Sequence, residues 1–176
     1  LVSSSAASDV YKRQAVEGVV NGIFFNQGHV CCAGSRLLLQ ESIHDQFVKK
    51  LEKRMQSLRV GNPLDKNTDI GAINSKEQLD KITSLVNEGV EDGGELFQTQ
   101  CELPGNGFWF RPSLFTNVQP SYSIAREEIF GPVLTTLTFR TPEEAVEIAN
   151  NTEYGLSAGV WTCLLYTSPS PRDRYI

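Results

Sequence analysis

The chain has 176 residues, which is enough for one domain with a substantial core but too few for two large ones. Its net charge of −5, with Lys and Arg scattered along the chain, argues against nucleic acid as the partner. No apolar run approaches the roughly 20 residues that span a bilayer. Four cysteines at uneven spacing, with no C-x-x-C pair, indicate neither a disulfide framework nor a zinc site. We therefore expect no nucleic-acid partner, no membrane partner and no metal, in a reducing compartment that is cytoplasmic or organellar.

The two ends differ in composition from the middle. Residues 1–14 (LVSSSAASDVYKRQ) show neither a helical nor a strand period, and residues 163–176 (CLLYTSPSPRDRYI) carry Ser-Pro pairs that no regular element continues. Both strings resemble translated sequencing adapters, with natural disordered tails as the alternative. We expect the folded domain to cover residues 15–162, and both flanks, non-native or disordered, to pack on nothing.

Three segments of this domain show the apolar period of a helix that buries one face, and a fourth helix is predicted from its capping residues. They are residues 15–26 with Val16, Val19, Val20, Ile23 and Phe24 inward, a helix after Ser42 with Ile43, Phe47, Leu51, Met55 and Leu58 inward, a helix after Ser75 with Leu79, Ile82, Val86 and Val90 inward, and a helix from Pro142 to about Asn150. Ser75 with Gln78 is typical of a capping box, and Thr141 before Pro142 is typical of an N-cap.

Short runs rich in β-forming residues alternate with these helices. The predicted strands are Arg36–Gln40, Glu95–Thr99, Phe108–Phe115, Val133–Phe139 and Leu156–Trp161. Strands that alternate with helices predict an α/β fold, with a largely parallel sheet flanked by helices.

A candidate nucleophile follows the first helix. The stretch from Phe24 to Arg36 reads FFNQGHVCCAGSR, in which a helix runs into a glycine and then into cysteines among small residues. Small neighbours leave room for a substrate, and Gly28 permits a turn that aims backbone N–H groups at a developing oxyanion. A thiolate is a strong nucleophile, although an inert buried cysteine is the commoner structural role. The residues alone leave both interpretations open.

This stretch resembles the active-site cysteine signature of the aldehyde dehydrogenase superfamily. That signature has Phe, three residues, Gly, then Gln or Glu, one further residue and Cys. Phe24, Gly28 and Cys31 occupy these positions, and His29 stands where the family has Gln or Glu. The resemblance implies that Cys31 is the catalytic nucleophile and that Cys32 is its neighbour.

A second stretch, REEIFGPV at residues 126–133, resembles the other specific motif of the same family. The resemblance implies that Glu128 binds hydroxyls of the nicotinamide ribose and that Phe130 packs beside the nicotinamide ring. A carboxylate accepts two hydroxyl donors, and an aromatic face positions a flat ring. Taken without the first motif, Glu128 would be a surface charge and Phe130 a core residue.

Weaker similarities support the same alignment. Residues 107–115 and 150–158 resemble two further family segments, and Gln78 and Lys81 match positions that approach the adenine-side ribose in some members. The resemblance covers residues 15–162 and is nearest to the family-16-like branch.

The resemblance implies a fragment of an enzyme that oxidises a small-molecule aldehyde to a carboxylic acid with NAD or NADP, through a thiohemiacetal and a thioester on the cysteine. It also implies that this chain covers most of a catalytic domain, and that the Rossmann-like cofactor domain, the general base and an oxyanion-hole Asn lie upstream. The whole enzyme is then expected to be a homo-oligomer, and the fragment alone to be inactive.

Two other interpretations stay open at this point. A catalytically silent scaffold of the same family would keep the fold and lose the activity, although the presence of Cys31 and Glu128 argues against it. A thiol peptidase or acyltransferase would need a histidine base for Cys31, and the chain offers only His29, which is close in sequence, and His44, which opens a helix.

Overall fold

The computed structural model describes residues 5–162. In chain order, the elements are α1 (Ser5–Phe24), η1 (Phe25–Gly28), β1 (Arg36–Gln40), η2 (Glu41–Ile43), α2 (His44–Met55), α3 (Lys76–Glu91), β2 (Glu95–Gln98), β3 (Ser113–Thr116), α4 (Ser123–Arg126), β4 (Val133–Phe139) and α5 (Pro142–Asn150). The strands form one sheet in the order β1-β4-β3-β2, in which β1, β4 and β3 are parallel and β2 is antiparallel to β3. The predicted α/β fold with a largely parallel sheet is confirmed.

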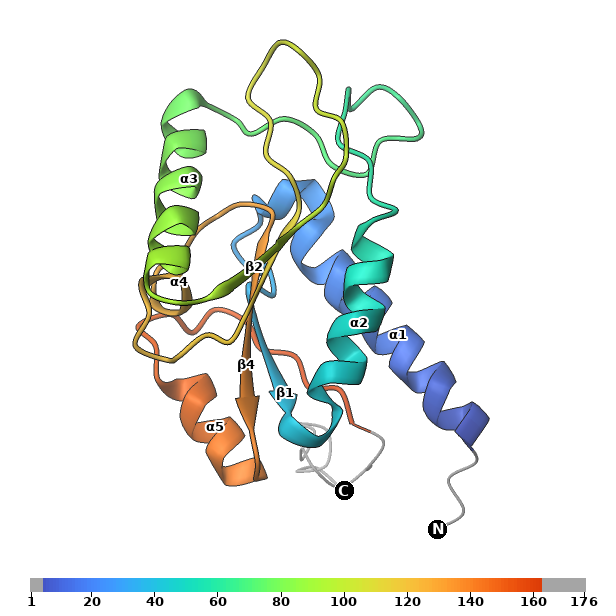
Figure 1. Cartoon of the computed structure of the whole chain (residues 1–176), viewed down its shortest axis with the longest axis vertical. Coiled ribbons are helices and arrows are strands. Elements are labelled where there is room, and N and C mark those ends of the chain that lie inside the picture. Colours follow the sequence, from blue (N-terminus) through green and yellow to red (C-terminus); the bar gives the residue numbers. More distant parts are fainter. Residues whose placement is uncertain (1–4, 163–176) are drawn as a thin grey trace, which may run out of the picture.

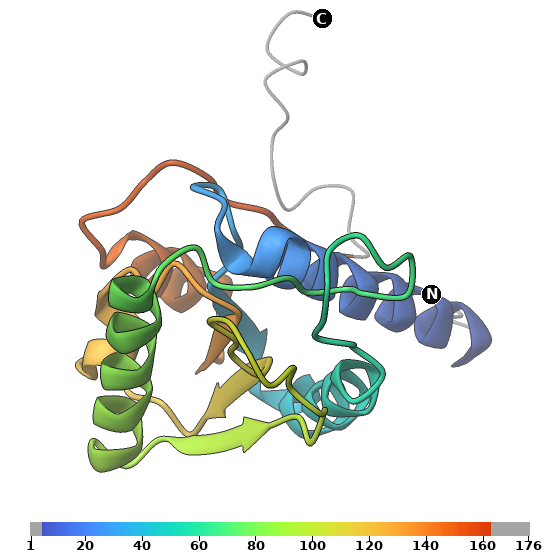
Figure 2. The same ribbon diagram turned by 90° about the horizontal axis from the view of Figure 1, so that it is seen from above.

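Helices cover both faces of this sheet, with α1 and α2 on one face and α3 and α4 on the other (Figures 1 and 2). Successive residues of a strand point to opposite faces, so each buried strand serves two cores. In β4, Leu134 packs in the core under α1 and α2, and Val133 packs in the core under α3 and α4. In β3, Leu114 and Phe115 divide in the same way.

Most residues of the predicted inward faces are buried; Val19, Ile43 and Leu79 are partly buried, and Val90 is exposed. Val16, Val20, Ile23 and Phe24 of α1, Phe47, Leu51 and Met55 of α2, and Ile82 and Val86 of α3 are all buried. Val90, the last predicted member on α3, is 47% exposed, so that prediction is wrong. The face of α3 continues through Gly89 instead, because a Cβ built there would lie 3.0 Å from the Ile124 side chain and 3.1 Å from the Phe115 ring.

Both predicted helix caps form. The Ser75 hydroxyl accepts the Gln78 backbone N–H at 3.1 Å, and the Thr141 hydroxyl accepts the Glu144 backbone N–H at 3.2 Å, which satisfies donors that a helix start leaves unpaired. The other half of the predicted capping box is wrong, because the Gln78 side chain donates to a distant loop.

The first helix begins earlier than predicted. Residues 5–14 continue α1, and Lys12 donates to the Gln46 side chain of α2 at 2.7 Å. The expectation of no regular structure is therefore wrong for these residues, and the reason is physical: residues 5–14 contain no Gly or Pro to stop the helix. A native domain starting at residue 15 stays a prediction. Residues 1–4 and the C-terminal flank from 163 lie outside the described residues.

Two strand predictions also need correction. The third predicted strand begins at Ser113 rather than Phe108, because Pro112 before it has no N–H for the ladder. Leu156–Trp161 forms no strand in the described chain. A strand needs a partner, and no strand within residues 5–162 pairs with this segment; Leu156 and Trp161 are 68% and 62% exposed.

Within residues 5–162, no helix combines the length and apolar character that a membrane crossing requires. In the same range, no group of three or more His, Cys, Asp or Glu side chains is arranged to hold a metal ion.

Candidate active site

The sheet topology brings the two sequence motifs together. The cysteine stretch ends where β1 begins at Arg36, and the second motif ends where β4 begins at Val133. Because β1 and β4 are parallel neighbours, the loops that enter them lie at the same edge of the sheet. A backbone hydrogen bond of 2.9 Å from Thr135 to Ser35 fastens the cysteine loop to β4.

The cysteine loop leaves α1 through a left-handed turn. Asn26, Gln27 and Gly28 have φ values of 49°, 49° and 76°, a conformation that costs energy for residues other than glycine. The Asn26 side chain donates to the His29 carbonyl at 3.1 Å, and the Gln27 side chain accepts the Gly71 N–H at 3.1 Å. Strained backbone of this kind persists only where its surroundings hold it, and it is concentrated at functional sites.

Both predicted thiols lie at the tip of this loop and are exposed to solvent. A backbone hydrogen bond connects this loop to α1, in which the Gly34 N–H donates to the Gly22 carbonyl at 2.9 Å. In the described part of the chain, the backbone N–H groups of Cys31 and Cys32 donate to no protein acceptor. The interpretation of Cys31 as a buried core residue is therefore wrong, because Cys31 is exposed.

The loop of the second motif, residues 126–133, also has a constrained backbone. Phe130 has a left-handed backbone, with φ of 52°. The Gln78 side-chain amide, from the first turn of α3, donates to the carbonyls of Ile129 at 2.9 Å and Phe130 at 3.0 Å. Gly131 follows, and its carbonyl lies so close to Gly28 that a Cβ on Gly28 would collide with it.

One aromatic contact joins the two loops. The imidazole of His29 stacks on the ring of Phe130, with centroids 5.5 Å apart and planes 6° from parallel. The His29 Nε2 atom is buried, and within the described residues it has no hydrogen-bond partner. Burial lowers the pKa of His29 below its usual 6.5, because the charged imidazolium loses solvation.

Glu128 lies at the open side of the second loop and is exposed. Its backbone N–H donates to the Tyr154 hydroxyl at 3.3 Å, which ties the loop to the segment after α5. No side chain of the described residues forms a hydrogen bond or ion pair with the Glu128 carboxylate. The carboxylate oxygens thus stay available to hydroxyl donors from outside the chain.

The structure gives three residues contacts that the sequence did not indicate. The Gln78 amide binds the Phe130 loop, the Tyr154 hydroxyl accepts the Glu128 N–H, and Gly131 allows the two loops to meet. Gln78 and Tyr154 lie in segments of weak family resemblance, which suggested a cofactor contact for Gln78, still a prediction, and no role for Tyr154. The Gly131 contact spans 103 positions of sequence and has no local signal.

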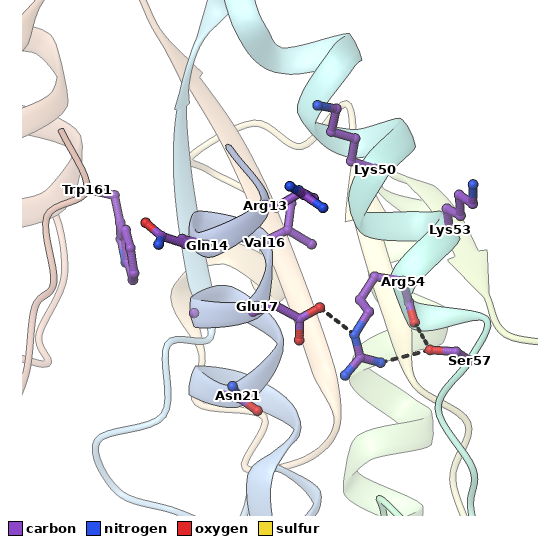
Figure 3. Close-up of a pocket in the computed structure, with 11 residues that line it drawn as sticks. Arg13, Gln14, Val16, Glu17, Asn21, Lys50, Lys53, Arg54, Ser57 and Trp161 are labelled. Carbon is purple, nitrogen blue, oxygen red and sulfur yellow. Dashed lines mark hydrogen bonds and ion pairs between the residues drawn. The ribbon is translucent and has the colours of Figure 1, made fainter. Parts of the chain in front are cut away.

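A cavity of about 1020 Å³ lies elsewhere, between α1, α2 and Trp161 (Figure 3). Glu17 accepts from Arg54 at 2.7 Å across it, and a Cβ on Gly18 would collide with the Trp161 ring. None of the predicted site residues lines this cavity. The cavity is therefore not the site that the motifs define.

The model of the aldehyde dehydrogenase family matches residues 4–167. Betaine aldehyde dehydrogenase of Bacillus subtilis (strain 168) is 42% identical over 153 residues, which are 84% of this chain and 31% of the relative.

Solved structures agree. The NAD-dependent aldehyde dehydrogenase from Sinorhizobium meliloti is 44% identical with a TM-score of 0.84, over 90% of this chain and 31% of that one. The indole-3-acetaldehyde dehydrogenase of P. syringae, solved with NAD+ and IAA, is 41% identical with a TM-score of 0.83, over 89% of this chain and 32% of that one.

The α/β architecture, the two motifs at one sheet edge and these matches agree: the chain belongs to the aldehyde dehydrogenase family. It spans about a third of the length of the relatives it matches.

Proposed function

We propose that this chain carries the catalytic cysteine of an enzyme that oxidises an aldehyde to a carboxylic acid with NAD or NADP, and that Cys31 is the nucleophile. The observation that carries the proposal is the meeting of the two loops. Gly28 against Gly131, and His29 against Phe130, put the exposed thiols next to the loop of Glu128.

The chemistry of the thiol follows from its position. The Cys31 sulfur attacks the carbonyl carbon, a C–S bond forms, and the carbonyl oxygen becomes an oxyanion. The backbone N–H groups of Cys31 and Cys32, which have no protein acceptor in the described chain, are the donors this chain offers to that oxyanion. Loss of hydride leaves a thioester on Cys31, and water then releases the carboxylic acid and regenerates the thiol.

The residues present fit one end of a nicotinamide cofactor, which when bound accepts the hydride. The exposed Glu128 carboxylate is free to accept ribose hydroxyls. One face of the Phe130 ring is covered by His29, which leaves its other face or its edge for a flat ring.

The chain alone is expected to be inactive. No G-x-G-x-x-G phosphate loop occurs in residues 15–162, so the cofactor pyrophosphate has no binding site of that kind there. Without it, the orientation needed for hydride transfer is lost. The part of the relatives that this chain does not cover, about two thirds of their length, would supply this binding site. We infer that the whole protein acts on a small-molecule aldehyde and is a cytoplasmic or organellar homo-oligomer.

The rival roles make different demands on the same residues. A cysteine peptidase or acyltransferase needs an imidazole bonded to the thiol, and within the described residues no hydrogen bond joins His29 to Cys31. A catalytically silent family member would need no accessible thiol at the loop tip, whereas Cys31 is exposed.

The test is a chimera in which residues 15–162 replace the matching segment of the Sinorhizobium meliloti enzyme. With an aldehyde and NAD or NADP, it should form NADH or NADPH; Cys31→Ser should abolish this and Cys32→Ser should leave most of it. A folded chimera with no activity would support the silent role. Equal loss in both serine variants would refute Cys31 as the specific nucleophile.

A further inference from the structure

The position where this chain departs from the family signature is also the position that contacts the second motif. His29 replaces the usual Gln or Glu, and its imidazole lies on the Phe130 ring, nearly parallel at 6° and with centroids 5.5 Å apart. In the described chain, this is the only ring–ring contact. Offset parallel rings at this separation attract each other beyond the burial of their surface.

We propose that His29 is a positioning residue, whose stacked imidazole fixes the Phe130 ring beside the loop that carries Cys31. The proposal rests on the proposed function, in which Phe130 receives the nicotinamide ring. It assigns His29 no proton transfer and no contact with the substrate.

Backbone contacts alone do not fix the Phe130 ring. Gln78 holds the Phe130 carbonyl at 3.0 Å, and the left-handed φ of 52° sets the direction of the chain, but the side-chain torsions of Phe130 remain to be determined by what packs on the ring. The ring is only half-buried, so part of its surroundings is solvent. The imidazole face supplies the missing constraint, and Gln or Glu has no such face.

The unpaired nitrogen of His29 points to the same role. Nε2 is buried, and among the described residues nothing hydrogen-bonds it, which is unfavourable for a polar atom. A histidine whose role was hydrogen bonding would have a partner. A histidine whose role is to present a flat ring needs none, so phenylalanine should replace it better than glutamine does.

The first test is proton NMR of the chain, which contains two histidines. His44 pairs with Asp45 at 3.0 Å and stacks on no ring of the described residues, so it is the internal control. The ring protons of His29 should lie upfield of those of His44, and Phe130→Leu should move only the His29 signals downfield. Equal shifts for the two histidines, or no response to Phe130→Leu, would overturn the stack.

The second test places 4-fluorophenylalanine at position 130 and records its ¹⁹F signal in the chain with His29 and in its His29→Phe and His29→Gln variants. In His29→Phe, the ¹⁹F line should stay narrow and keep its chemical shift away from that of the free amino acid. In His29→Gln, the line should broaden or its chemical shift should move toward that of the free amino acid, because loss of the stack reduces the ordered population of the ring roughly two- to tenfold. A glutamine variant that matches wild type, or a phenylalanine variant that fails like glutamine, would contradict the proposal. Far-UV circular dichroism shows that each variant is folded, and neither readout depends on whether the whole protein oxidises aldehydes.

Discussion

Gly28 and Gly131 approach each other through their backbones, and a single methyl group on Gly28 would overlap the Gly131 carbonyl oxygen. This contact joins the end of the first helix to the loop before β4, 103 residues later. The His29–Phe130 stack is the next contact outward from it, and Cys31 follows two residues further. The geometry of the site therefore depends on the absence of a side chain at Gly28.

Gly28→Ala should destabilise the chain by about 2 kcal/mol or more, since alanine resists the φ of +76° and its methyl group meets backbone that cannot move aside. Gly22→Ala is the matched control. Gly22 lies on the exposed side of α1 with nothing within 4 Å of a built Cβ, so alanine there should be neutral or stabilise by up to about 1 kcal/mol. Urea unfolding measures both, and equal effects would contradict the close approach.

Gln78→Met should cost about 1–3 kcal/mol, because it leaves the carbonyls of Ile129 and Phe130 without their shared donor. Lys81→Met, on the exposed face of the same helix, controls for the change in α3 and should stay within about 0.5 kcal/mol. Thermal unfolding compares the two. A Gln78 variant as stable as the Lys81 variant would show that the amide does not hold the loop.

Stability should depend on pH through His29. Its folded pKa lies below 6.5 because of burial, so below about pH 6.5 the unfolded chain binds more protons at this site than the folded chain does. The contribution of neutral His29 to the free energy of unfolding is therefore complete above about pH 6.5, and it is lost as the pH falls through the folded pKa. The free energy of unfolding of wild type should drop relative to His29→Phe between about pH 7.5 and 5.5. Parallel pH profiles would contradict this prediction.

Glu128→Ala, made in the chimera, should slow NADH formation by the loss of a charge-assisted hydrogen bond, typically about 1.5–3 kcal/mol, with no change in fold because the side chain is exposed. Glu127→Ala removes the preceding exposed carboxylate and should leave the rate near wild type. Stopped-flow measurement of the first turnover separates them. An unchanged first turnover in the Glu128 variant would make that carboxylate an ordinary surface charge.

Local patterns in the sequence predicted much of this structure. The apolar period of α2, the caps at Ser75 and Thr141, and the strand from Val133 are all present, because each depends on neighbours within a few residues. The prediction for Val90 was wrong because Gly89 and Val90 stand three and four residues after Val86, so periodicity does not distinguish them. The packing of Ile124 and Phe115 against Gly89 decides between them.

Long-range features could not be predicted in this way. The motifs indicated Cys31 and Glu128, yet the meeting of the two loops that carry them follows from the pairing of β1 with β4, which no local pattern specifies. The same holds for the Gln78 amide, which a capping box would have turned back toward its own helix and which instead reaches Ile129 and Phe130. Leu156–Trp161 has the composition of a strand, but a strand forms only where a partner exists.

The central claim is that the thiol of Cys31 bonds covalently to the substrate, and mass spectrometry tests it directly. The chimera is mixed with aldehyde and NAD, quenched in acid during turnover and digested with trypsin, and the peptide that ends at Arg36 and contains both cysteines is fragmented. The acyl mass is expected on Cys31; it should be absent from the Cys31→Ser variant and unaffected by Cys32→Ser. An acyl group on Cys32, or NADH formation with no adduct on either cysteine, would contradict it.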